Sequence, residues 1–157
     1  MQTGRDRIAL REAGPSETST ERVEQMPEPS DIDVELPAVP ATSPQMRAIL
    51  RNYLTAIPID ERRDDVILAA GEALGNAIEH AYRGGDGVVR LTAAVAGNLL
   101  VVEIRDEGRW RLEGDAERGR GLGIMRALVD RVAIESSRQG TCVRLELALA
   151  VPQPLAP

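Results

Sequence analysis

The chain has none or very little of several residue types, and this scarcity limits the kinds of structure and site it can form. Its 157 residues include no phenylalanine, no lysine and a single cysteine, Cys142. One cysteine excludes an internal disulfide and a cysteine-rich zinc site. A net charge of −6 without a clustered basic stripe argues against nucleic acid as a direct partner. The sequence also has no apolar run near the roughly 20 residues of a membrane-spanning helix and no signal-peptide core, so we expect a cytoplasmic protein without membrane contact.

Composition divides the chain into one domain and two tails. Residues 1–30 are rich in Ser, Thr, Glu and Pro and poor in large apolar side chains, which predicts a disordered tail. The end of the chain, residues 151–157, is expected to be a short second tail. One domain is expected over residues 31–150. Because 43% of the residues are hydrophobic but only 2% are aromatic, its core must be aliphatic.

Hydrophobic periodicity predicts a strand and two helices in the first half of the domain. Residues 32–37 alternate apolar and polar side chains and end at a proline, which is typical of an edge strand. A helix is expected to start with Ser43 as its N-cap and to be broken at Pro58. A second helix is expected from Asp60, as its cap, to about Tyr82.

In the second half of the domain, the sequence pattern predicts two β-hairpins separated by a loop and a short helix. The strand at 99–106 is nearly all aliphatic, as expected for a strand covered on both faces. The order β-α-α-β-β-loop-α-β-β predicts a two-layer α/β sandwich with a largely antiparallel sheet. The expected segments are a hairpin of strands 88–96 and 99–106, a mobile loop at 107–121, a helix at 122–130 and a hairpin of strands 131–137 and 141–149.

The second helix contains GEALGNAIEHAY, which places Glu72, Asn76 and His80 at four-residue steps. Glu72 and Asn76 lie one turn apart and point the same way. A carboxylate can accept a proton from a hydroxyl, and an amide oxygen can bind a hard cation such as Mg²⁺. Taken alone, a solvated polar face is the simpler interpretation. Gly71 and Gly75 count against it, because each costs up to about 1 kcal/mol relative to alanine, which indicates close packing or ligand approach.

Two further segments suit a nucleotide, although each is a weak signal in isolation. Asp106 ends a strand and is followed by Gly108; the carboxylate can accept a hydrogen bond from an exocyclic amine, and the glycine lets a flat ring lie close. The stretch GRGLG, residues 119–123, precedes a helix, where backbone N–H groups suit phosphate. It lacks the Lys and Ser/Thr of a P-loop and does not sit in a Rossmann-type βαβ unit, which argues against both of these nucleotide-binding motifs.

Together, in this order, the three segments resemble the ATP-binding core of the GHKL ATPases, the Bergerat fold. GEALGNAIEHAY and GRGLGIMRALVDRV are most similar to bacterial anti-sigma-factor serine/threonine kinases, and the resemblance covers about Asp31 to Ala148. It implies a mostly antiparallel sheet with helices on one face, and ATP and Mg²⁺ as cofactors. It also implies a sigma factor and an anti-anti-sigma (STAS-domain) protein as partners, and it allows a homodimer.

The resemblance implies a role for each matching residue. Glu72 matches the general base that accepts the proton of a target hydroxyl or water, and Asn76 matches the Mg²⁺ ligand. Asp106 matches the acid that reads the adenine amine, with Gly108 making room beside it. His80 matches in type and either braces the helix end or touches the ligand. The other matches contact the nucleotide: Gly119, Arg120, Gly121, Leu122 and Gly123 in the loop around the phosphates, and Thr141 as a hydroxyl supporting adenine.

One departure from the family pattern lies beside Asp106, because Trp110 stands where many members have the second glycine of Asp-x-Gly-x-Gly.

Four functions are compatible with this sequence. The leading one is an ATP-dependent kinase that binds a sigma factor and phosphorylates an anti-anti-sigma protein. An ATP-binding anti-sigma switch without useful phosphotransfer is the alternative. The catalytic domain of a sensor histidine kinase needs a separate phosphoacceptor, because the only histidine, His80, lies in the ATP-site helix. An α/β domain without a ligand is the fourth.

Overall fold

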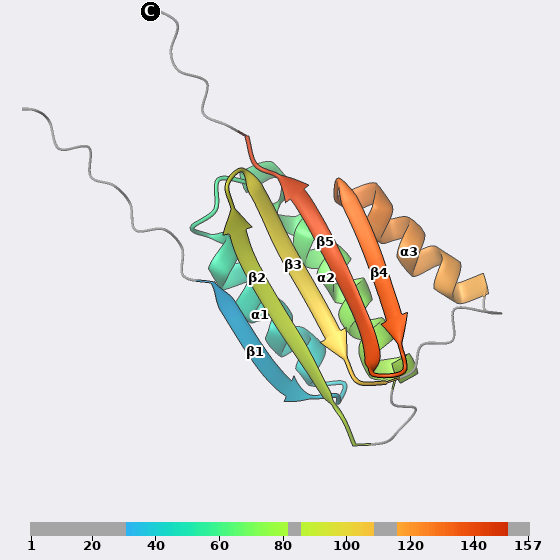
Figure 1. Cartoon of the computed structure of the whole chain (residues 1–157). Helices are drawn as coiled ribbons and strands as arrows, with labels where there is room; N and C mark the ends of the chain where they lie inside the picture. Colours follow the sequence, from blue (N-terminus) through green and yellow to red (C-terminus); the bar gives the residue numbers. More distant parts are fainter. Residues whose placement is uncertain (1–30, 82–85, 109–115, 151–157) are drawn as a thin grey trace, which may run out of the picture.

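A computed structural model describes residues 31–81, 86–108 and 116–150. In these ranges the chain forms a five-stranded antiparallel sheet with three α-helices on one face (Figure 1). This confirms the predicted two-layer sandwich with helices on one face. The expected tails at 1–30 and 151–157 lie outside the described residues. No helix in the described part is long and apolar enough to cross a membrane.

The sheet has the strand order β1-β2-β3-β5-β4, with every neighbouring pair antiparallel. The predicted edge strand is confirmed, because β1 pairs with β2 alone. Gly97 closes the first hairpin with a φ of +63°, a backbone region that favours glycine. The strands are β1 Ile32–Pro37, β2 Val88–Ala96, β3 Leu99–Asp106, β4 Arg131–Ser137 and β5 Gly140–Ala148.

The helices begin and end at different residues than the sequence predicted. Helix α1, Thr42–Leu54, has no side-chain cap, so the prediction of Ser43 as its N-cap is wrong. Instead, the buried Thr42 hydroxyl donates to the Pro37 carbonyl and ties the helix to the end of β1. The helix also ends before Pro58, at Leu54.

The second predicted helix is three consecutive segments. A 3-10 turn, Asp60–Arg62, leads into α2, Arg63–Asn76, and a π-helical turn, Ala77–Ala81, follows it. The α-helix therefore starts after Asp60 and is capped by no side chain. Helix α3, Ala116–Leu128, starts well before the predicted residue 122. The prediction of a loop over 107–121 is therefore wrong for residues 116–121. Residues 109–115 lie outside the described part.

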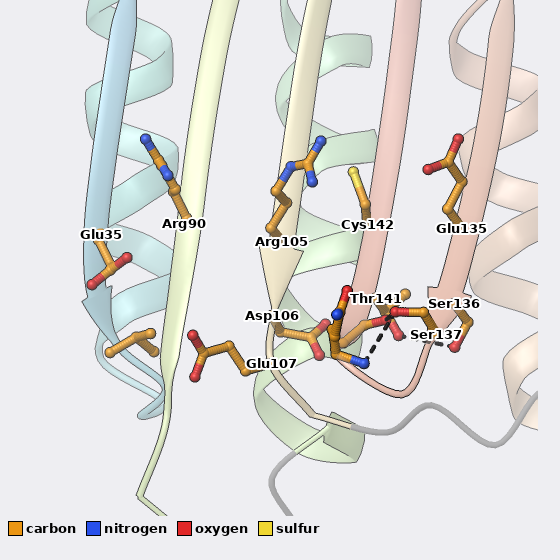
Figure 2. A pocket seen from close by; sticks show the side chains of 13 residues that line it. Glu35, Arg90, Arg105, Asp106, Glu107, Glu135, Ser136, Ser137, Thr141 and Cys142 are labelled. Atoms are coloured by element: carbon orange, nitrogen blue, oxygen red, sulfur yellow. Dashed lines mark hydrogen bonds between the residues drawn. The ribbon is translucent and has the colours of Figure 1, made fainter.

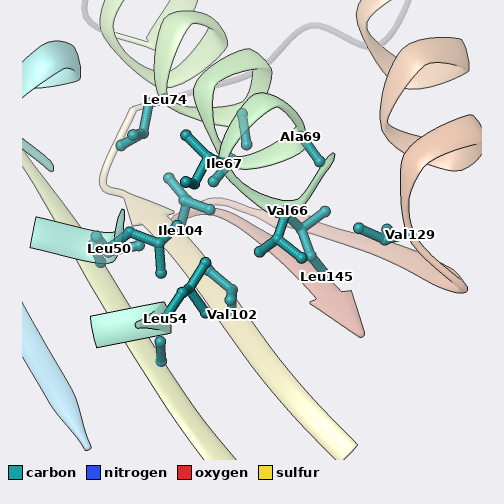
Figure 3. Packing of buried hydrophobic residues seen from close by; sticks show 14 of the residues in the cluster. Leu50, Leu54, Val66, Ile67, Ala69, Leu74, Val102, Ile104, Val129 and Leu145 are labelled. Carbon is teal, nitrogen blue, oxygen red and sulfur yellow. The ribbon is translucent and has the colours of Figure 1, made fainter. Parts of the chain in front are cut away.

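The core is aliphatic, as predicted, apart from Tyr53, and lies between the sheet and the helices (Figure 3). Helix α2 lies at its centre, where it contacts both α1 and α3. Because α2 is covered on both sides, Val66, Ala69 and Ala73 are buried as well as Ile67 and Leu74.

Within residues 31–81, 86–108 and 116–150, the second face of the sheet carries no helix. Burial alternates along β3, so the prediction that this strand is covered on both faces is wrong. On the open face Glu103 accepts hydrogen bonds from Arg105 at 3.0 Å and Arg144 at 2.9 Å. These long side chains shield the aliphatic residues beside them in place of a second layer.

A charged contact joins the ends of three elements. Asp130 accepts hydrogen bonds from the Arg62 guanidinium at 2.9 Å and from the Ala148 N–H at 2.7 Å. Arg62 also donates to the Leu128 carbonyl at 3.0 Å, at the end of α3. The Ala148 N–H, and then Arg62, hold the pKa of Asp130 below its ordinary value of 3.8.

We expect Asp130→Asn to destabilise the fold by about 1 kcal/mol at pH 7, since an amide cannot accept both bonds as a carboxylate does and the site is partly exposed. A lowered native pKa contributes stability above the unfolded value, and this stability is lost as pH falls through the native pKa. The difference between variant and wild type should therefore shrink in acid, below about pH 4. Urea unfolding at pH 7 and at decreasing pH measures this; a difference independent of pH would contradict it.

Candidate functional site

Glu72 and Asn76 lie on the last turns of α2, both partly buried, with α3 lying against them. A Cβ built on Gly121 would be 3.3 Å from Glu72 Oε2 and 3.5 Å from Asn76 Nδ2. The structure therefore brings together a carboxylate, an amide and a glycine of the GRGLG stretch. A larger residue at position 121 would press on both polar side chains.

The two glycines of α2 have different surroundings. Arg47 of α1 lies across Gly71, and a Cβ there would be 3.2 Å from Arg47 Cδ. Close packing thus explains Gly71. A Cβ on Gly75 would meet nothing within 4 Å, so the helix surface at this glycine, next to Asn76, is open. Gly75 leaves room for a ligand to approach the helix backbone.

The π-helical turn begins directly after Asn76 and contacts β3 and β5. Such turns within helices occur frequently at functional sites. This one brings the end of the helix to the strands that carry Asp106 and Thr141. His80 belongs to the turn, but its side chain lies outside the described residues, so its role stays a prediction.

Asp106 ends β3 on the face that the helices cover and is 6% exposed. The Gly108 N–H donates to its Oδ1 at 2.9 Å, which fixes the carboxylate in one orientation. Thr141 lies directly opposite Asp106 in the sheet and is also buried. Residues opposite each other in a sheet point to the same side, so the two groups form a polar end to an otherwise aliphatic face.

Two residues of this polar end were missed in the sequence. Ser136 lies opposite Thr141 on β4, with the two hydroxyl oxygens 3.4 Å apart. Gly140 has a φ of +136°, and a Cβ there would be 1.9 Å from the Asp106 carbonyl oxygen. A serine in a strand carries no distinguishing signal, whereas a glycine before Thr141 could have indicated a close backbone approach.

A hollow of about 400 Å³ lies at the same end of the sheet, on its open face. Figure 2 shows Arg90, Arg105 and Cys142 in its lining. Arg105 and Asp106 are successive strand residues and so point to opposite faces. The hollow therefore opens mainly on the face away from Glu72, but Asp106, Thr141 and Ser136 also line it at the ends of the strands. Its arginines are engaged by Asp33 and Glu103, and burial raises the pKa of the Cys142 thiol, which disfavours the thiolate form.

The residues on the helix-covered side suit Mg²⁺ and a purine nucleotide. The described ranges hold no group of three or more His, Cys, Asp or Glu that could bind a metal by itself. An amide oxygen at Asn76 could supply one hard ligand, and Mg²⁺ commonly takes the others from phosphates and water. Asp106 and Thr141 supply a buried acceptor and a hydroxyl for a base.

The GRGLG stretch differs from its prediction as a loop. Residues 119–123 lie inside α3, with Gly121 buried, Leu122 partly buried on the core, and Arg120 and Gly123 exposed. Trp110 lies outside the described part. The predicted contacts of this stretch with phosphate stay predictions.

The fold and these residues suit a nucleotide-binding domain, and the chain was compared with known proteins. The family model "Histidine kinase-like ATPase domain" matches residues 36–147. An anti-sigma F factor of Clostridium acetobutylicum is 32% identical over 108 residues, which cover 60% of this chain and 76% of that protein. An anti-sigma F factor of a Thermoanaerobacter species is 30% identical over 103 residues, covering 56% and 71%.

A solved structure adds support for the fold. The crystal structure of the RsbU and RsbW domains of a Mycobacterium tuberculosis protein matches with a TM-score of 0.64 and 26% identity, over 82% of this chain. The match spans 35% of that longer chain. The present chain thus belongs to the histidine kinase-like ATPase domains and, within the GHKL superfamily, to the anti-sigma-factor family. This confirms the resemblance and the Bergerat fold that the sequence predicted.

Asn76→Ala should weaken binding of Mg·ATP roughly tenfold or more and leave binding of metal-free ATP little changed, because its predicted contact is to the cation. Calorimetric titrations with Mg²⁺ and with EDTA measure the two affinities. Asn52→Ala is the matched control, since Asn52 is an exposed helical asparagine on α1. An equal loss with and without Mg²⁺ would show that Asn76 binds no metal.

Proposed function

We propose that this protein is an ATP-dependent serine/threonine protein kinase that acts as an anti-sigma factor. It would bind a sigma factor and phosphorylate an anti-anti-sigma, STAS-domain partner; a sigma-factor partner would place it in the cytoplasm. The observation that carries the proposal is the pairing of Glu72 and Asn76 beside the open surface at Gly75. The named relatives, which are anti-sigma F factors, support the choice of partner.

Each described residue has a chemical task in this proposal. Bound Mg²⁺ supplies charge neutralisation on the phosphates, and the Asn76 amide oxygen would hold it. Glu72 accepts the proton of the attacking serine or threonine hydroxyl, the part that a carboxylate plays in protein kinases. Asp106, oriented by the Gly108 N–H, accepts a hydrogen bond from the adenine amine. Thr141 lies beside it and supports the base.

Phosphotransfer to a protein tests the proposal directly. The purified chain is incubated with Mg·ATP and a STAS-domain protein encoded in the same genome, and the phosphorylated residue is located by mass spectrometry. A phosphoserine or phosphothreonine on the partner supports the kinase. Nucleotide-dependent binding of the partner or a sigma factor without transfer would replace it with the anti-sigma switch. Failure to bind ATP would contradict both.

A further inference from the structure

Two exposed apolar side chains lie near Glu72 on the solvent side of the helices. In the described residues three large apolar side chains are exposed: Leu68 at 49%, Val39 at 46% and Ile124 at 38%. Val39 belongs to the connection between β1 and α1. Leu68 and Glu72 are four residues apart on α2, so they share one face of the helix, about 6 Å apart along its axis. Leu68 is thus a solvent-exposed neighbour of the proposed base.

Ile124 of α3 lies beside the same face of α2. The two helices pack on each other, and Gly121 of α3 lies against Glu72. At the other end of the contact, the Leu128 carbonyl accepts a hydrogen bond from Arg62, the residue before α2, so the helices are antiparallel. Residues 121, 124 and 128 are three and four apart and share one side of α3. Ile124 is therefore level with the turn of α2 that precedes Glu72.

We propose that Leu68 and Ile124 form an apolar docking surface for the protein that is phosphorylated, beside its target hydroxyl; this rests on the proposed function. Single exposed apolar side chains are common on proteins, so the position of this pair carries the argument and not its size. A hydroxyl reaches Glu72 from the solvent side of α2, because the residues on the other side are buried in the core. A specific interface covers roughly 800 Å² on each partner, so a folded protein over Glu72 also covers Leu68 and Ile124.

The charges around this surface define the chemistry of the partner. Glu61 and Asp64 are exposed, and they are seven and four residues before Leu68, so they lie on its face of the helix. Neither forms an ion pair with another described residue, because Arg62 is engaged by Asp65 and Asp130 instead. The complementary surface is an apolar side chain flanked by lysine or arginine, next to the serine or threonine that accepts the phosphate.

The same charges disfavour a second copy of this chain as the occupant. In a symmetric dimer the same patch of both subunits forms the interface. The carboxylates of Glu61 and Asp64 would then face an equally acidic surface, and like charges across an interface are unfavourable. A basic partner protein has no such penalty.

The test exchanges the apolar side chains for polar ones of similar length. Leu68→Gln and Ile124→Gln should each raise the KM for the protein partner roughly five- to thirtyfold. The kcat at saturating partner and the calorimetric ATP affinity should stay close to those of the wild type, because docking contacts act equally on ground and transition states. Leu68→Met should restore most of the KM, since it keeps the apolar volume. Val39→Gln is the matched control and should leave the KM unchanged.

The charge complementarity is tested separately. The double variant Glu61→Gln, Asp64→Asn should make the KM for the partner less sensitive to salt concentration. Carboxylates at the start of a helix also interact favourably with its dipole. A lower melting temperature with an unchanged salt dependence would therefore assign both residues to the helix alone and overturn the basic partner surface.

The remaining outcomes separate this inference from the proposed function. A wild-type KM in both glutamine variants, with phosphotransfer by the wild type, would overturn the docking surface and leave the proposed function standing. Weaker binding of the sigma factor alone, with an unchanged KM, would also overturn it, as would a changed oligomeric state with an unchanged KM. Absence of phosphotransfer by the wild type would remove the proposed function and this inference with it.

Discussion

Glu72→Gln should reduce phosphotransfer to the partner protein by roughly 10²–10⁴-fold and change ATP affinity little. Glutamine has nearly the shape of glutamate, so it keeps the contact with Gly121 on α3. It cannot accept the proton of the attacking hydroxyl. Because a base acts on a proton that moves only in the transition state, the loss should fall on kcat rather than on KM.

The control for the Glu72→Gln variant removes a nearby negative charge that is not one of the proposed site residues. Glu79 is exposed on the π-helical turn, and Glu79→Gln should transfer phosphate at a rate close to that of the wild type. Single-turnover phosphotransfer and calorimetric ATP titration are measured on both variants. Wild-type transfer by Glu72→Gln would mean that the base is another residue. A parallel loss of ATP binding would assign Glu72 to ground-state binding.

The fold could be predicted because local pattern and tertiary structure agree over most of the chain. Period-2 and period-3.6 apolar spacing located the strands and the helices, and turn residues such as Gly97 located a hairpin. The open face of β3 could not be predicted from its aliphatic content. Its shielding comes from Arg144, which is distant in sequence and lies beside Glu103 only in the folded sheet.

The start of α3 shows where local preference fails. Three glycines at 119, 121 and 123 favour a loop, yet these residues are helical. Packing of α3 on α2, with Gly121 against Glu72 and Asn76, outweighs the low helix propensity. Such tertiary packing is not visible in a short sequence window.

The site residues also divide into those that local sequence spacing predicts and those whose positions depend on tertiary structure. Glu72 and Asn76 could be paired from sequence, because four-residue spacing fixes their relation on a helix. The neighbours of Asp106 depend on strand register. Thr141 was placed by family resemblance alone, and Ser136 was missed, since their positions opposite one another follow from the pairing of β3, β5 and β4.

Gly140→Ala should disrupt the pairing of Asp106 with Thr141. A Cβ at position 140 would be 1.9 Å from the Asp106 carbonyl oxygen and 2.9 Å from Glu107 Cα. Both are backbone atoms and cannot rotate away, and a φ of +136° is strained for any other residue. The ends of β3 and β5 must therefore separate. This moves Asp106 away from Thr141, and a displacement of about 1 Å can cost roughly 100-fold in function.

We accordingly expect Gly140→Ala to lower ATP affinity roughly 100-fold and to destabilise the fold by about 2–4 kcal/mol. Gly97→Ala is the matched control, because Gly97 also has a positive φ, +63°, but a Cβ there would meet nothing within 4 Å. That variant should lose stability through backbone strain and retain ATP binding. ATP titrations well below both melting temperatures separate the effects. Wild-type ATP affinity in Gly140→Ala would show that the Asp106–Thr141 pair does not hold the base.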